Sequence, residues 1–172
     1  TVLCGQLEGH PYRDVFSTVY SDDEEGGHFA ALAMKKRGRK DIVAVLGPQD
    51  NPAVVDRLRG YRAVLGEDLP DANVIYTGWN SGDGYQAMHQ ILAREMAFDG
   101  VLCGSDRIAA GVITALNEAG LSVPADVSVV GFDDHEIATR CVPALTTVRQ
   151  PLREEGHMAA NIALDMIKGA EP

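Results

Sequence analysis

Length, composition and charge exclude several classes of protein. The chain has 172 residues, of which 45% are hydrophobic, and it carries a formal net charge of −10. This length allows a full hydrophobic core, and the apolar fraction is typical of a globular protein. The sequence has no apolar run of the roughly 18 residues that a membrane-spanning helix needs. Its acidity argues against direct binding to DNA, because proteins that bind the phosphate backbone do so with clustered Lys and Arg.

Cysteine usage predicts a reducing compartment. Cys4, Cys103 and Cys141 are an odd number without CxxC spacing, and the first two fall inside apolar runs. Reduced, buried thiols are the usual state of such residues. No basic-then-apolar leader begins at Thr1, so we expect a cytoplasmic protein.

Short apolar runs predict the strands of a parallel sheet, because parallel strands are buried on both faces. The runs are Val2–Cys4, Thr18–Tyr20, Ile42–Leu46, Val74–Tyr76, Val101–Cys103, Val127–Phe132 and Thr146–Val148.

Apolar residues at helical spacing predict helices between most of these strands. The stripes are Val54, Leu58, Tyr61 and Leu65; Tyr85, Met88, Leu92 and Met96; and Ile108, Val112, Ala115 and Ala119. The acidic run Asp22–Glu25 should begin the first long helix, and the basic cluster at residues 35–40 should end it, where each charge complements the helix dipole. Gly38 and Gly120 stand where helices should stop. This order predicts an α/β fold with a doubly wound parallel sheet.

Acidic residues follow two of the predicted strands. Asp106 comes shortly after the run at 101–103, and Asp133 directly after the run at 127–132. In open α/β sheets, ligands bind beyond the carboxyl ends of the strands. The sequence has no G-x-S-x-G elbow, no phosphate loop and no G-x-G-x-x-G motif, and its five histidines lack zinc-ligand spacing. We therefore expect a binding site without catalytic residues, metal or cofactor.

Three stretches resemble the ligand-binding region of the LacI/GalR family of bacterial transcription regulators. They are Ser105–Gly111, Gly120–Asp134 (GLSVPADVSVVGFDD) and Pro143–Pro151 (PALTTVRQP). The resemblance implies a periplasmic-binding-protein-like fold of type I, built from two lobes. Residues 1–21 would be the end of the first lobe, 22–148 the complete second lobe, and 149–172 a return to the first.

The resemblance also implies which residues bind a ligand. Arg57, in GPQDNPAVVDRLRGY, matches the family arginine that hydrogen-bonds hydroxyls or carboxylates, although composition alone indicates an exposed helix arginine. Asp133 matches the cleft-facing acid of G-F-D-D, and its carboxylate can accept two hydrogen bonds; a turn cap is the alternative. Trp79 matches an aromatic residue that stacks on the ligand; a loop aromatic is the alternative.

Weaker matches and two departures complete the expected site. Asn51 and Gln150 carry neutral amides suited to bridging hydroxyls. Ser105 stands where many members have asparagine, so its direct contact with ligand is weakly supported. Gly5 stands where many sugar-binding members have aspartate, which weakens the assignment to a sugar.

The sequence therefore predicts the effector-binding and dimerisation region of a LacI-type regulator. A sugar-like effector, or less favourably a purine or nucleoside, would bind between the lobes and modulate binding to operator DNA. DNA contact would use a helix-turn-helix absent from this chain, in a homodimer. The alternative is a periplasmic or lipid-anchored sugar-binding protein of a transport system; a small oxidoreductase or hydrolase is a third possibility that the missing motifs disfavour.

The carboxyl-terminal segment should form an amphipathic helix. Ala159, Ile162, Ala163 and Met166 make its apolar stripe. In the resembled family this helix packs on the first lobe, so we expect the stripe to lack its usual partners and to be covered by another copy or by first-lobe residues.

Overall fold

The chain divides into two compact units that the order of its elements explains. The structure is a computed structural model that describes residues 1–6, 16–94 and 96–169. One unit comprises Thr1–Asp22 with Gln150–Pro172, and the other comprises Asp23–Arg149. These divisions lie within one residue of the lobe boundaries expected from the sequence, although assigning each unit to a lobe remains a proposal.

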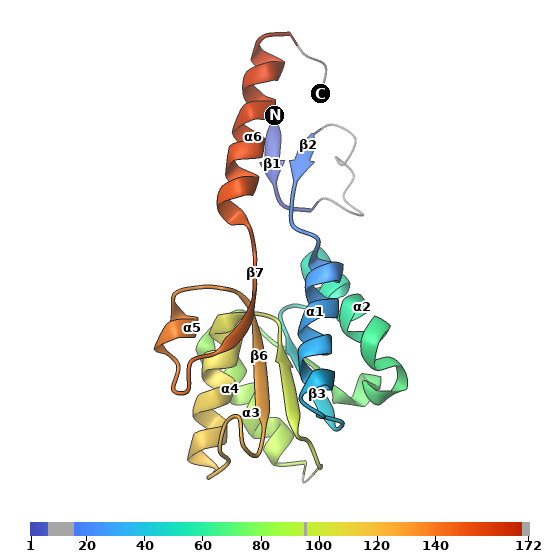
Figure 1. The fold of residues 1–172 in the computed structure, drawn as a ribbon, viewed down its shortest axis with the longest axis vertical. Helices are drawn as coiled ribbons and strands as arrows, with labels where there is room; N and C mark the ends of the chain where they lie inside the picture. The colour runs from blue at the N-terminus through green and yellow to red at the C-terminus, as the bar shows by residue number, and fades with distance from the viewer. Residues whose placement is uncertain (7–15, 95, 170–172) are drawn as a thin grey trace. The chain divides into compact units, whose positions relative to one another are not determined.

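The larger unit is a five-stranded parallel sheet with helices on both faces (Figure 1), which confirms the predicted fold class. Its strand order is β4-β3-β5-β6-β7. The strands are β3 (Ile42–Leu46), β4 (Val74–Tyr76), β5 (Gly100–Cys103), β6 (Ser128–Asp133) and β7 (Thr146–Arg149). The helices are α1 (Asp23–Lys36), α2 (Pro52–Leu65), α3 (Ser81–Leu92), α4 (Asp106–Glu118) and α5 (Ile137–Arg140), with short 3-10 turns at Gly66–Asp68 and Asp71–Asn73.

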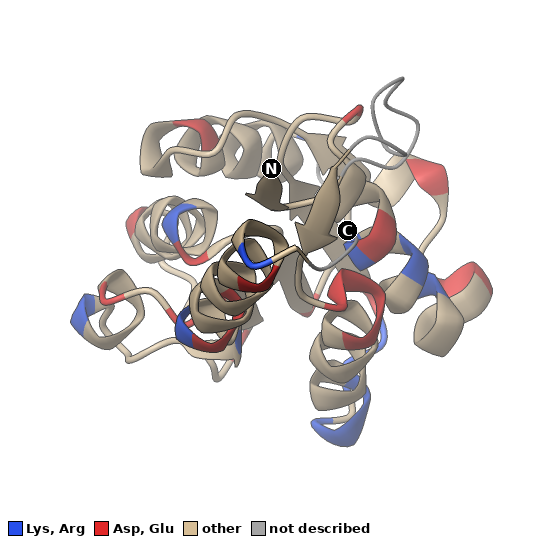
Figure 2. Ribbon diagram, turned by 90° about the horizontal axis from the view of Figure 1, so that it is seen from above, with Lys and Arg blue, Asp and Glu red and all other residues tan. Residues whose placement is uncertain are grey.

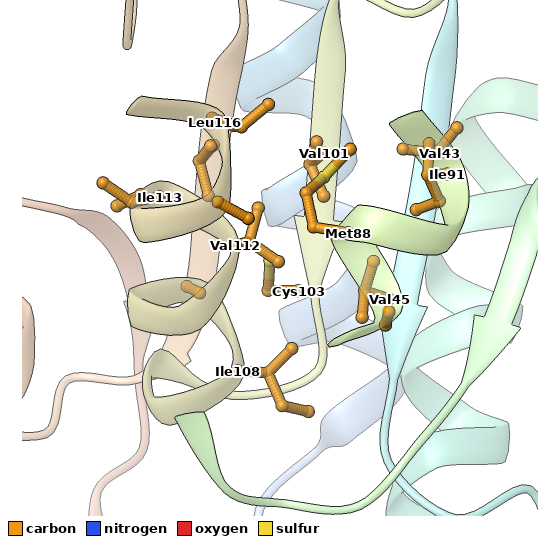
Figure 3. Packing of buried hydrophobic residues seen from close by; sticks show 14 of the residues in the cluster. Val43, Val45, Met88, Ile91, Val101, Cys103, Ile108, Val112, Ile113 and Leu116 are labelled. Atoms are coloured by element: carbon orange, nitrogen blue, oxygen red, sulfur yellow. The ribbon is translucent and has the colours of Figure 1, made fainter. Parts of the chain in front are cut away.

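Alternate side chains of each strand enter different cores. Val43 and Val45 of β3 pack in the cluster that α3 and α4 cover, which Figure 3 shows in close view. Ile42, Ala44 and Leu46 pack in the cluster under α1 and α2. This alternation is the two-residue period of a strand buried on both faces.

Most predicted elements are present, with differences at their ends. The stripe of α2 is buried along its whole length, but Ala119 is the exposed C-cap of α4 and Met96 lies beyond the end of α3. The predicted strand 127–132 is shifted by one residue, so that Asp133 is its last residue. Gly38 and Gly120 take positive φ values of 75° and 78°, as residues that end helices commonly do.

The smaller unit pairs β1 (Val2–Cys4) and β2 (Ser17–Val19) in parallel, and α6 (Leu152–Ile167) contacts both strands. Ala159 is buried, and Ile162, Ala163 and Met166 are half-buried. The predicted stripe therefore contacts β1 and β2 of its own unit and is only partly covered by them, and its coverage by another copy or by first-lobe residues stays a prediction. Among the described residues, no helix combines the length and apolarity that crossing a membrane requires.

Glycines set the distance between the helices on each face. A Cβ at Gly111 of α4 would lie 1.9 Å from the carbonyl oxygen of Ser81, and one at Gly84 of α3 would lie 2.2 Å from that of Ile108. On the other face, a Cβ at Gly60 of α2 would lie 2.0 Å from the carbonyl oxygen of Glu24. Both helix pairs thus cross with their backbones in direct contact.

We predict that Gly111→Ala lowers the free energy of unfolding by about 1–3 kcal/mol, because the added methyl meets backbone that cannot rotate away. Gly156→Ala is the matched control, since nothing lies within 4 Å of its Cβ position in α6. The control should be neutral or stabilising by up to about 1 kcal/mol. Urea unfolding of both variants measures the difference; equal effects would contradict the close crossing.

Candidate functional site

Polar residues gather at the carboxyl edge of the five-stranded sheet. The segments that follow β3, β4 and β5 carry Asn51, Trp79 and Ser105, and Asp133 ends β6. Because the four strands are adjacent and parallel, these positions share one edge of the sheet. This is the edge where open α/β sheets bind ligands.

Arg57 is buried at this edge, with only 4% of its surface exposed. Its Nε donates to Asp23 Oδ1 at 2.7 Å, and Nη1 donates to the carbonyl oxygen of Gly104. The guanidinium carbon lies 3.7 Å from the centroid of the Phe132 ring, a cation–π arrangement. The interpretation of Arg57 as an exposed helix arginine is therefore wrong: three elements hold its guanidinium in one orientation.

Asp133 faces the same guanidinium. Its Oδ1 lies 3.7 Å from Arg57 Nη1, and 31% of its side chain is exposed. Burial raises the pKa of Asp133 to about 6; Arg57 opposes this shift, whereas the nearby Asp106 and Asp23 add to it. The backbone φ of 111° is a conformation that non-glycine residues rarely adopt, and such strain often accompanies binding sites.

Asp106 lies at this edge but has a structural role. Its side chain accepts hydrogen bonds from Thr147 Oγ1 at 2.5 Å and from the His135 backbone N–H at 2.7 Å. Burial raises its pKa, and these two hydrogen bonds oppose that shift. The residue is 0% exposed, and its hydrogen bonds join the start of α4 to the segment after β6 and to β7.

Asn51 and Ser105 are helix N-caps. Asn51 Oδ1 accepts from the Ala53 backbone N–H at 3.0 Å, and Ser105 Oγ accepts from the Ile108 backbone N–H at 3.2 Å. Ser105 is 4% exposed. Capping explains both residue types without a ligand. Their positions just before apolar helices are a sequence signal of capping.

Trp79 is half-buried beside β3. A Cβ at Gly47 would lie 2.5 Å from its ring, so glycine at this position leaves room for the indole. The ring also packs against both hydrophobic cores. The structure thus brings Arg57 and Asp133 together and places Trp79 at the same edge, beyond β3. Gln150 belongs to the other unit.

Sequence reasoning missed the partners of Arg57. Asp23 was recognised as a helix-start residue, but its pairing with Arg57 spans 34 positions. The Gly104 carbonyl and the Phe132 ring carry no motif that marks such contacts. In the described parts of the chain, no group of three or more His, Cys, Asp or Glu residues is arranged to hold a metal ion.

Comparison with known proteins identifies the family. The model of the periplasmic binding protein-like domain matches residues 31–172, which is most of the chain. The chain belongs to this family. Its sequence is 37% identical over 162 residues to the HTH-type transcriptional repressor PurR of Salmonella arizonae, and 38% identical to PurR of Pectobacterium atrosepticum. Each match covers 92% of this chain and 48% of the relative, so the chain spans about half the length of these relatives.

Solved structures of LacI-family regulators share the fold of this family member. The transcriptional regulator CelR in complex with cellobiose has a TM-score of 0.91 at 34% identity, covering 99% of this chain and 54% of that one. A LacI-family regulator from Enterococcus faecalis with bound ribose has a TM-score of 0.82 at 30% identity, covering 88% and 55%. An Escherichia coli regulator complexed with phosphate has a TM-score of 0.83 at 29% identity, covering 90% and 57%. The predicted resemblance to LacI-type regulators is confirmed.

We predict that Asp23→Asn lowers the free energy of unfolding by about 3 kcal/mol, because it leaves the buried Arg57 charge without its nearest counter-ion. The control is Asp71→Asn, which removes the partner of Arg62 where the carboxylate is 94% exposed. Loss of such a surface pair should cost at most about 1 kcal/mol. Denaturant unfolding compares the two, and a loss no larger than the control would show that the pair does not hold the site.

We further predict that Asp133 titrates near pH 6, and that Arg57→Gln raises its pKa further because Arg57 favours the ionised form. The folded-state pKa lies above the ordinary 3.8, so the contribution of Asp133 to stability is complete below pH 3.8 and is lost as the pH rises through about 6. Carboxyl ¹³C NMR, with Asp133→Asn to assign the resonance, measures both values. A midpoint near 4 in the wild type would contradict the burial of this carboxyl group.

Proposed function

We propose that this chain is the effector-binding and dimerisation region of a LacI-type transcriptional regulator. The observation that supports this proposal most directly is the buried Arg57, which is fixed by Asp23 and faces Asp133 at the carboxyl edge of the sheet. A guanidinium oriented before the ligand arrives loses little entropy when it binds. The role is binding rather than catalysis, in keeping with relatives that are repressors.

The charges around Arg57 favour an uncharged effector with several hydroxyl or N–H groups. Asp23 at 2.7 Å and Asp133 at 3.7 Å already offset the charge of the guanidinium. In the described part of the chain, the hydrogen bonds of Arg57 use Nε and Nη1, so Nη2 remains to donate to a ligand oxygen. Asp133 would accept from hydroxyls, and the Trp79 ring would stack on a sugar or base.

A sugar or sugar derivative fits this arrangement first, and a purine or nucleoside second. The bound cellobiose and ribose of two structural neighbours support the sugar. Asn51, Ser105 and Gln150 remain proposed contacts, with capping as the competing role of the first two. A transport-system sugar-binding protein is the alternative, and the names of the relatives favour the regulator.

The partners of the whole protein follow from the same proposal. Figure 2 shows both acidic and basic residues on the helices, and the net charge is −10. Operator DNA would therefore be bound by a helix-turn-helix outside these residues, in a cytoplasmic homodimer. The effector and the operator would each change the affinity for the other through one conformational equilibrium.

A thermal-shift panel on the full-length protein tests the ligand site. We expect a neutral sugar or nucleoside to raise the unfolding midpoint with concentration, as mass action requires, and to do so more than its phosphate ester. Arg57→Lys should weaken the response about tenfold in concentration, the effect of losing one charge-assisted hydrogen bond.

Arg59→Lys is the matched control, because it makes the same change on the same helix at a side chain that is 54% exposed. Its concentration response should equal that of the wild type. A preference for the phosphate ester would contradict the neutral-effector assignment. Equal responses of the two variants would contradict the site itself.

A further inference from the structure

A cavity of about 450 Å³ lies at the opposite end of the sheet from Arg57. Its walls include the first residues of β6, residues 143–145 before β7, Pro124 and the last turn of α1. All of these belong to the larger unit. We call it the edge cavity, because β7 is the edge strand of the sheet (Figure 1).

The edge cavity exists because β7 begins late. Thr146 is the first residue of β7 in the ladder, and it pairs with Val130. Ser128 and Val129 of β6 precede this pairing, so β7 leaves their side of the sheet uncovered. In the register of this ladder, Leu145 and Ala144 would face Val129 and Ser128, but the Leu145 N–H donates instead to the carbonyl oxygen of Ala138 at 2.9 Å. The uncovered edge is two residues long, which is too short to receive an added peptide strand and suits a small molecule.

The lining combines an apolar floor with cations. Met34, Ile113 and Val129 are each at most 6% exposed. Lys36 and Arg37 also line the cavity, and none of the described lining residues is acidic, although the chain has 25 acidic and 15 basic residues. The carboxyl end of α1 contributes roughly half a negative charge, so the two cations leave a positive local balance. A volume of this size accommodates a small organic ligand.

We propose that the edge cavity binds a small amphipathic anion, an aromatic or branched aliphatic carboxylate. Its apolar body would contact Met34, Ile113 and Val129, and its carboxylate would face Lys36 and Arg37. This site is separate from the effector site and does not depend on its assignment. Both α1 and β6 extend from the edge cavity to the partners of Arg57, namely Asp23 and Asp133. An occupant would therefore contact both elements that hold the guanidinium.

A ¹⁹F NMR titration of the full chain tests this proposal with two probes of the same shape. The probes are 4-fluorobenzoate and the neutral 4-fluorobenzyl alcohol. We expect saturable binding of both, with the benzoate binding more tightly. The double variant Lys36→Gln/Arg37→Gln should weaken benzoate binding about fivefold, which is near the upper limit for an exposed ion pair. It should leave binding of the alcohol unchanged.

Two further variants distinguish the effect of the cavity's positive charge on binding from the effect of its free volume. Lys35→Gln/Lys40→Gln removes the same charge from exposed residues outside the cavity lining and should change benzoate binding less than twofold. Ala33→Phe, at a half-buried lining position of α1, should abolish binding of both probes, with thermal unfolding to confirm that the variant folds. Binding that survives Ala33→Phe, or equal losses in the two charge variants, would overturn the proposal. Exclusion of the probe on dimerisation, measured by sedimentation, would assign the cavity to a second copy and would also overturn it.

Discussion

The arrangement at the carboxyl edge depends on neutralising one buried positive charge. Removing a guanidinium from water costs several kcal/mol unless its charge and its buried donors find partners. Arg57 finds them in the Asp23 carboxylate of α1, the Gly104 carbonyl after β5 and the Phe132 ring of β6, with Asp133 somewhat farther away. These partners come from three elements that the chain order separates. Folding of the larger unit therefore assembles the proposed site, and the site in turn constrains how the elements meet.

The helix crossing on this face makes the ion pair possible. A Cβ at Gly27 of α1 would lie 2.3 Å from the carbonyl oxygen of Arg57, and Gly60 makes the reciprocal contact with α1. Only glycine allows α1 and α2 to approach so closely, and this brings the first residue of α1 within 2.7 Å of Arg57 Nε. Gly47, the residue after β3, likewise leaves space for the Trp79 ring. These glycines thus set both the packing of the helices and the geometry of the proposed site.

Local patterns predicted the fold well and the site only partly. Continuous apolar runs such as Ile42–Leu46 identified the strands because burial on both faces removes every polar position. The motif around Arg57 indicated a ligand contact, but Asp23 and Gly104 lie 34 and 47 positions away and no local spacing connects them. Asp106 resembled a ligand acid because it follows a strand; its burial depends on Thr147, which only the tertiary fold brings near. Ser105 and Asn51 fitted two roles, helix N-cap and ligand contact, and the structure shows the N-cap.

We propose that Asp23 holds Arg57 in place while its Nη2 group remains available to an effector. The direct measurement is NMR of the Arg57 guanidinium, with ¹⁵N labelling, during titration of the full-length protein with a stabilising ligand. We predict that the Nε–H resonance is slow to exchange with water, keeps its shift through the titration and is lost in Asp23→Asn, whereas the Nη resonances move as the ligand saturates. A ligand that shifts Nε–H and leaves the Nη resonances unchanged would contradict this role of Arg57.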